Sequence, residues 1–158
     1  MRTLLAAPAL FVLAVITACA PKEGAKGETT AMAPAPAMAP AAKTPASFAG
    51  TWSTTATLDG VAKPVPTTLV GSADGATWTV SLEGRPNVAA TASMSGDSLI
   101  VQTAEYESVL RKGVMVTTRT ASVMSDSTMM TGNMVALYKT PKGVEEVKGT
   151  IMAMRAPK

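Results

Sequence analysis

Few residues of this chain can carry out acid–base or nucleophilic chemistry. The 158-residue sequence contains no histidine and one cysteine, Cys19. Without histidine, neither Ser-His-Asp nor Cys-His catalysis can form, and zinc has no imidazole ligand. Glu105 and Glu107 are two residues apart, so on a strand they share one face. Glycosidase chemistry would need a cleft that separates their pKa values. The alternative is an exposed ion pair of Glu105 with Arg119 on the next strand, and we expect no enzyme activity, cofactor or metal.

Cys19 follows a segment that predicts export from the cytoplasm. Arg2 is followed by an apolar stretch, Leu4 to Ile16, which is too short to span a bilayer and is typical of a secretory signal. Ile16-Thr17-Ala18-Cys19 resembles a bacterial lipobox. The resemblance implies cleavage before Cys19, lipidation of its sulfur and acylation of its new amine. Several acyl chains give stable membrane anchoring. Ala20 follows the cysteine, and its resemblance to the enterobacterial sorting pattern, in which a residue other than Asp stands there, implies the outer membrane, facing the periplasm.

The charge distribution argues against a nucleic-acid partner. The chain has 14 Lys+Arg and 11 Asp+Glu, a formal net charge of +3. Its basic residues are scattered, whereas nucleic-acid binding requires a basic stripe or patch. With one cysteine, an intrachain disulfide cannot form.

Composition divides the chain into three parts. Residues 1–18 are the predicted signal peptide. Residues 19–46 are rich in Ala and Pro and contain no aromatic residue, so we expect a disordered, lipid-anchored linker. Residues 47–158 are rich in Thr and Val and form the predicted folded domain.

The folded domain is expected to be all-β. Short runs rich in β-branched residues alternate with turns that contain Asp-Gly or Lys-Gly steps, as tight hairpins require. The predicted strands cover 50–58, 65–71, 76–82, 88–94, 98–110, 114–124, 128–139 and 144–155. Eight sequential antiparallel strands favour an up-and-down barrel, which has no exposed edge. A two-sheet sandwich is the alternative.

Period-2 alternation indicates which side chains face the interior. The first predicted strand places Trp52, Thr54, Ala56 and Leu58 on one apolar face, and the last places Ile151, Ala153 and Arg155 on one face. Many of the expected interior residues are small. Such a barrel is either hollow or flattened and filled by its own side chains.

Gly50-Thr51-Trp52 on the first strand and Arg155 at the end of the last resemble the lipocalin/calycin pattern. The likeness covers Phe48 to Arg155. It implies that the arginine packs across the tryptophan and closes one end of the barrel. A guanidinium can stack on an indole face in this way.

The candidate ligand-binding residues are the large and polar side chains expected inside the barrel. Each has a purely structural alternative: tryptophan and methionine also fill cores without binding anything. The residues are Trp52, Trp78, Met94, Gln102, Tyr106, Thr118, Met134 and Arg155.

Two functions are consistent with these features. The first is a membrane-anchored envelope lipoprotein whose barrel binds a small apolar or amphipathic molecule. The second is a structural or inhibitor-like lipoprotein with a filled barrel, which binds another protein through its outer surface.

Overall fold

The structure, a computed structural model, describes residues 41–157, which lie within one compact unit. Cys19 and the predicted linker up to residue 40 lie outside the described residues.

A short 3₁₀ helix, η1 (Pro45–Phe48), precedes nine strands, and it begins two residues before the predicted start of the folded domain. The strands are β1 (Gly50–Leu58), β2 (Val65–Gly71), β3 (Trp78–Ser81), β4 (Val88–Ser95), β5 (Ser98–Thr103), β6 (Tyr106–Glu107), β7 (Met115–Met124), β8 (Met129–Thr140) and β9 (Gly143–Arg155).

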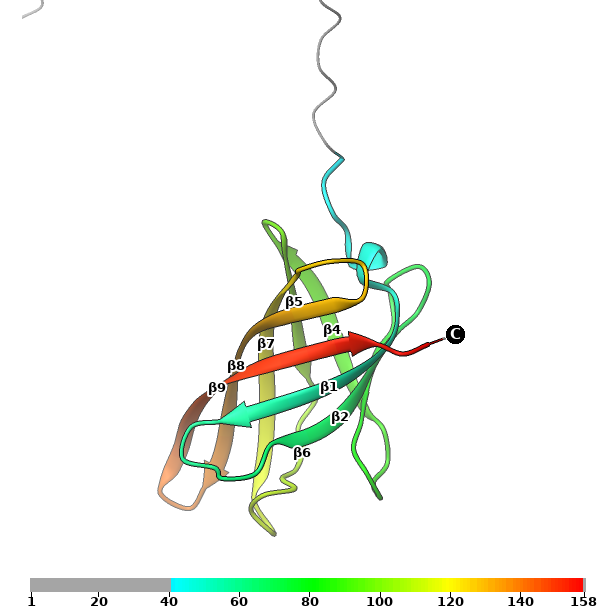
Figure 1. The fold of residues 1–158 in the computed structure, drawn as a ribbon. Coiled ribbons are helices and arrows are strands. Elements are labelled where there is room, and N and C mark those ends of the chain that lie inside the picture. Colours follow the sequence, from blue (N-terminus) through cyan, green and yellow to red (C-terminus); the bar gives the residue numbers. More distant parts are fainter. Residues whose placement is uncertain (1–40, 158) are drawn as a thin grey trace, which may run out of the picture. The chain divides into compact units, whose positions relative to one another are not determined.

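The strands form one closed antiparallel barrel (Figure 1). Their order is β5-β4-β3-β2-β1-β9-β8-β7-β6, and β5 also pairs with β7 to close the sheet. Because β5 and β6 occupy successive parts of the same position beside β7, the barrel has eight strand positions. The predicted eight-stranded up-and-down barrel is therefore confirmed. Within residues 41–157, no helix is long and apolar enough to cross a membrane.

The alternation of side chains explains why these segments are strands. In β1 the buried residues are Trp52, Thr54, Ala56 and Leu58, and the residues between them are exposed. Apolar burial along one face, at about 25 cal/mol per Å², stabilises each strand against its neighbours. Hydroxyl groups that turn inward find partners: the Thr54 hydroxyl bonds to the hydroxyl and carbonyl of Thr67.

Two inward-facing glycines allow strands to approach closely. A Cβ added at Gly132 of β8 would overlap the carbonyl oxygen of Ala121 and lie 2.6 Å from Cα of Ser122 on β7. A Cβ at Gly149 of β9 would overlap the carbonyl oxygen of Thr57 on β1. Glycine at such positions lets strongly curved strands of a barrel pack against each other.

The interior contains two hydrophobic clusters. One lies beside η1 and contains Phe48, Trp52, Trp78 and Leu99, all 0–1 % exposed. We call this the η1 end. The other contains Leu58, Met134, Ala136 and Tyr138 and lies toward the opposite end, which we call the loop end. The loop end carries residues 59–64, 82–87, 108–114 and 141–142, which connect β1 to β2, β3 to β4, β6 to β7 and β8 to β9.

The predicted strand 98–110 is interrupted by a bulge. Gln102 pairs with Arg119, whereas Tyr106 pairs with Val116, so three residues of this strand oppose two of β7. An extra residue reverses which side chains face inward beyond it. Val101 and Thr103 face inward before the bulge, and Tyr106 and Ser108 face inward after it. The prediction that Gln102 and Tyr106 share one face is therefore wrong.

Candidate ligand-binding site

A small cavity lies inside the barrel toward the loop end. Its volume is about 60 Å³, and most of its wall is apolar. Its lining includes Leu58 of β1, Val80 of β3, Leu82 directly after β3, and Met134 and Ala136 of β8. Small-molecule sites usually measure about 300–1,000 Å³. The barrel is thus nearly filled by its own side chains, and its void has room for only a few water molecules.

Five hydroxyl-bearing residues also line the cavity: Thr67, Tyr106, Ser108, Thr118 and Tyr138. Burial raises the pKa of Tyr106, and a hydrogen bond with the Thr118 side chain offsets part of that rise. The Thr118 hydroxyl lies 3.2 Å from the hydroxyl of Thr103, which accepts the backbone N–H of Thr118 at 2.9 Å. A hydroxyl network on an otherwise apolar wall can orient a ligand that has one polar group.

The β6–β7 loop covers the cavity. Ser108 is buried, and its hydroxyl oxygen accepts the backbone N–H groups of Leu110 at 3.0 Å and Arg111 at 3.1 Å. This turn places Val109 and Leu110 over the barrel mouth, where they line the cavity while remaining 39 % and 38 % exposed. Two half-exposed aliphatic side chains therefore separate the cavity from solvent at this end.

Arg111 attaches the same β6–β7 loop to β9. Its guanidinium donates two hydrogen bonds of 2.7 Å to the Glu145 carboxylate and stacks 4.2 Å above the Tyr138 ring. The ion pair raises the pKa of Arg111 and lowers the pKa of Glu145. A bidentate pair of this geometry holds the loop against β9 more firmly than a single contact would.

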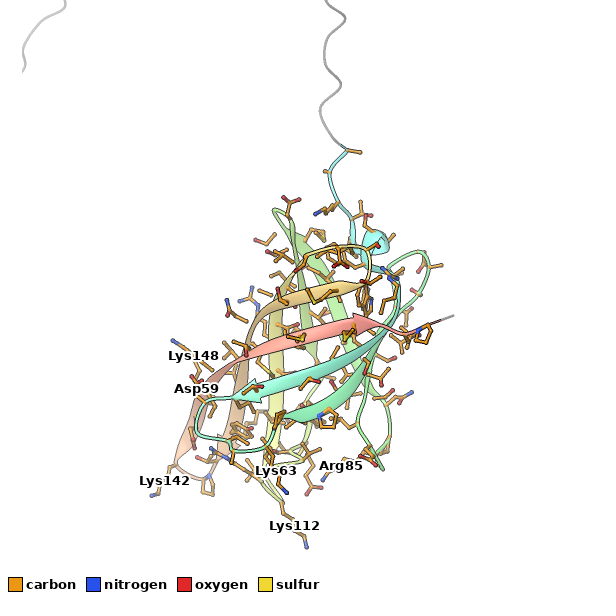
Figure 2. All side chains as sticks on the ribbon, viewed as in Figure 1. Asp59, Lys63, Arg85, Lys112, Lys142 and Lys148 are labelled. Atoms are coloured by element: carbon orange, nitrogen blue, oxygen red, sulfur yellow. The ribbon has the colours of Figure 1, made fainter. Side chains whose placement is uncertain are left out.

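Larger grooves surround the cavity at the loop end. A groove of about 220 Å³ is lined by Lys63, Leu82 and the Val109–Leu110 pair. A second, of about 560 Å³, lies on the barrel wall beside β6 and includes Arg85, Tyr106 and Leu82 in its lining. Figure 2 shows Lys63, Arg85 and Lys112 at this same end of the barrel, on three different loops.

The structure brings together three of the eight predicted ligand-binding residues. Tyr106, Thr118 and Met134 line the cavity. Trp52 and Trp78 are buried in the cluster at the η1 end, and Met94 packs against that cluster. Gln102 is exposed on the outer wall, because it precedes the bulge that turns Tyr106 inward.

The tryptophans and Arg155 have structural roles that their bonds make clear. The Trp52 indole N–H donates to the Phe48 carbonyl at 2.8 Å, and that of Trp78 donates to the Gly75 carbonyl at 2.9 Å. Arg155 lies 4.1 Å above the Trp52 ring and donates to the carbonyls of Ala49 at 2.7 Å and Ser127 at 2.9 Å. The arrangement implied by the lipocalin resemblance, with arginine packed across tryptophan at one barrel end, is present.

Several cavity residues were not among those predicted. Ser108, Val109 and Leu110 were assigned to a continuous strand that ends at residue 110. The sequence contains one indication of the loop: an aliphatic pair directly before Arg111-Lys112-Gly113, where a strand should already be turning polar. Leu82, Ala136 and Tyr138 also line the cavity and were not among the predicted ligand-binding residues.

The carboxylates of Glu105 and Glu107 both lie on the outer wall of the barrel. Glu105 forms an ion pair with Lys139, not with Arg119 as predicted, because the bulge moves it past Arg119 along β7. A carboxylate oxygen of Glu107 accepts the backbone N–H of Gly113 at 2.9 Å. Each carboxylate therefore already has a structural partner. In the part of the chain that the structure describes, no three acidic, histidine or cysteine side chains lie close enough to hold a metal ion.

Comparisons with known proteins found no matching family model, no similar curated protein and no similar solved structure.

Proposed function

We propose that this protein binds a small apolar or amphipathic molecule at the loop end of its barrel. The observation that carries the proposal is the make-up of the cavity wall, which is mostly apolar and includes five hydroxyl-bearing residues, among them Tyr106, Ser108 and Thr118. Such a wall suits a molecule with a hydrocarbon portion and one polar group. Burial of the hydrocarbon supplies the affinity, and the hydroxyl groups set its orientation.

A ligand must enlarge the cavity, and the β6–β7 loop allows this. Val109 and Leu110 are the covering side chains, and both are more than one-third exposed. Displacing them exposes little additional apolar surface, so the free energy required is small compared with that of opening a closed core. A ligand chain would then replace them against Leu82 and Met134.

We further infer that the chain is a lipoprotein anchored through Cys19 in the outer membrane, with its folded domain facing the periplasm. The support is the sequence from Arg2 to Ala20. Bacteria that express the full chain and are fed an alkyne-tagged fatty acid should yield a labelled protein in the membrane fraction. The variant Cys19→Ala should carry no label. An equally labelled Cys19→Ala protein would contradict anchoring at this residue.

Binding is tested with a substitution that fills the cavity. Ala136 is 1 % exposed and lines the cavity, so the three carbon atoms added by Ala136→Leu occupy ligand space. Ala121→Leu adds the same atoms at an exposed position of β7 and is the matched control. The segment Ala39–Lys158 contains the whole closed sheet and both clusters, so it is a complete folding unit.

This segment is incubated with a bacterial total lipid extract, desalted and measured by native mass spectrometry. The expected result is a reproducible small-molecule adduct on the unsubstituted segment and on Ala121→Leu, at least tenfold weaker on Ala136→Leu. A bare mass for all three proteins would refute the proposal.

A second candidate function, binding of another protein, is favoured by one surface. Met152 and Met154 of β9 point outward and are 52 % and 59 % exposed. Met154 pairs with Met129, and Met152 pairs with Thr131, which in turn pairs with Val123, so these side chains are neighbours on the outer wall. Exposed methionines suit adaptable protein contacts. Loss of a partner in cross-linking experiments with Met152→Lys would support this candidate.

A further inference from the structure

The barrel wall has an opening on the side of β6. β4 pairs with β5 up to Ala90 and Thr103, and the last bond between the two segments runs from the Ala104 N–H to the Ala89 carbonyl. Beyond the bulge, β6 pairs with β7 but with no other described strand. The first residues of β4 and the β3–β4 loop therefore face β6 without a backbone ladder between them.

The β3–β4 hairpin that borders this opening is weakly held. β3 has four residues and forms three pairs with β4, the last between Val80 and Val88. One side-chain bond spans the opening: the Arg85 Nη1 donates to the Glu107 carbonyl at 2.7 Å. A short hairpin that is fixed to the opposite strand by one exposed hydrogen bond can open locally at a low free energy.

The groove of about 560 Å³ occupies this opening. Its size falls within the usual range of small-molecule sites, unlike that of the interior cavity. Pro86, Val88, Ala89 and Ala104 give it apolar surface, and Arg85, Asn87, Glu105 and Glu107 give it polar surface. The groove thus combines apolar surface with a cationic group.

Two side chains separate the groove from the interior cavity. Leu82 and Tyr106 line both spaces. Rotation of either side chain, or movement of the hairpin that carries Leu82, would join the groove to the cavity. A chain-like molecule could then lie in both.

Arg85 is the group in the groove that remains available to a polar head. Its side chain is exposed and forms no ion pair among the described residues. Of the guanidinium nitrogens, only Nη1 is hydrogen bonded. Glu105 in the same groove is paired with Lys139. The Glu107 carboxylate is bound to the Gly113 N–H on the β7 side. A guanidinium binds a carboxylate or phosphate with two parallel hydrogen bonds.

We propose that this wall groove is the outer half of the binding site and that it selects a single-chain amphiphile with an anionic head. The head binds Arg85, and the chain passes between Leu82 and Tyr106 into the interior cavity. The ligand reaches the cavity through the wall beside β6, and displacement of Val109 and Leu110 at the mouth gives its chain room inside. This inference rests on the proposed function, because it specifies the ligand of the same cavity.

The test uses three ten-carbon probes that differ in their heads: decanoate, decanol and decylammonium. Their affinities for the segment Ala39–Lys158 are measured by isothermal titration calorimetry below the concentration at which they aggregate. Decanoate should bind about tenfold more tightly than decanol, and decylammonium should bind most weakly. Arg85→Ala should weaken decanoate binding about tenfold and leave decanol binding within twofold, whereas Arg85→Lys should retain part of the preference.

The groove itself is tested by filling it. Ala104 is exposed and lines the groove, so Ala104→Trp should weaken decanoate and decanol binding at least tenfold. Ala121→Trp places the same side chain on the outer wall of β7 and should change neither affinity. Ala89→Trp fills the groove from β4 and replaces Ala104→Trp if circular dichroism shows that the latter does not fold.

The outcomes separate the two proposals. If Ala136→Leu abolishes probe binding while Arg85→Ala and Ala104→Trp bind like the unsubstituted protein, the ligand does not use the groove. The interior site then stands and this inference is overturned. If decylammonium or decanol binds more tightly than decanoate, the groove does not select an anionic head and this inference is overturned. If no probe binds the unsubstituted protein, both proposals fail for single-chain amphiphiles.

Discussion

Arg155 connects three segments that are far apart in the sequence. Its guanidinium stacks on Trp52 and donates to carbonyls at Ala49 and Ser127. These contacts seal the barrel at the η1 end, next to the N-terminal residues of β1. An arginine also stacks on an aromatic ring at the loop end, where Arg111 lies over Tyr138. There it attaches the β6–β7 loop to β9 through its ion pair with Glu145.

Removal of the Arg155 side chain should destabilise the barrel. Arg155→Ala loses a cation–π contact and two charge-assisted hydrogen bonds, and we expect the free energy of unfolding to fall by about 2–4 kcal/mol. Urea unfolding followed by circular dichroism measures this change. Arg119→Ala, at an exposed position of β7, is the control and should stay within about 0.5 kcal/mol of the unsubstituted protein. Equal stability of both variants would show that the Arg155 contacts are unimportant.

The Arg111–Glu145 pair should make loop attachment sensitive to acid. The guanidinium lowers the pKa of Glu145 below its ordinary value of 4.5. A carboxyl whose pKa is depressed by folding contributes stability above its unfolded pKa and loses it as the pH falls through its folded pKa. Glu145→Gln should therefore have a lower Tm than the unsubstituted protein at pH 7, and the difference should be smaller at pH 3 than at pH 7. Glu83→Gln on the β3–β4 loop is the control, with no such difference expected at either pH.

At the scale of elements, the bulge between β5 and β6 determines the chemistry of the site. It turns Tyr106 inward and Gln102 outward, and it ends the pairing with β4 that would otherwise seal the wall. The strong curvature of β8 and β9 has a different origin, in the inward-facing glycines at 132 and 149. The bulge interrupts the ladder, whereas the ladders of β8 and β9 continue without interruption through both glycines.

Gly132 should tolerate no side chain. In Gly132→Ala the new Cβ overlaps the backbone of β7, so the strands must separate or β8 must shift. We expect a loss of about 1–3 kcal/mol in the free energy of unfolding, measured by urea denaturation. Asn133→Ala, on the exposed face of the same strand, is the matched control and should change stability by less than about 0.5 kcal/mol. A stable Gly132→Ala protein would mean that the close approach of β7 and β8 is not required.

At the scale of the whole folded unit, the closed sheet ties its two clusters into one structure. Each strand pairs on both sides except near β6, so neither cluster can lose its strands without opening the ladder of the other. Small domains of this kind usually unfold in one cooperative step. A site at the loop end can nevertheless change locally, because the β3–β4 and β6–β7 loops lie outside the ladder.

The segment Ala39–Lys158 should therefore unfold in a single transition. In differential scanning calorimetry, its calorimetric and van't Hoff enthalpies should agree, as two-state unfolding requires. Trp fluorescence, which monitors the η1 end, and Tyr absorbance, which monitors the loop end, should give the same midpoint. Two separate midpoints would show that the clusters unfold independently.

The sequence by itself determined the eight-stranded barrel and the interior face of β1, and its resemblance to the lipocalin pattern implied the contact of Arg155 with Trp52. The first two features follow from local physics: β-branched runs, period-2 alternation and turn glycines act over a few residues. It did not predict the bulge at Ala104 or the loop over the cavity, and so misplaced Gln102 and the partner of Glu105. Only tertiary structure decided these, because register and cavity volume depend on how eight strands close around one set of side chains.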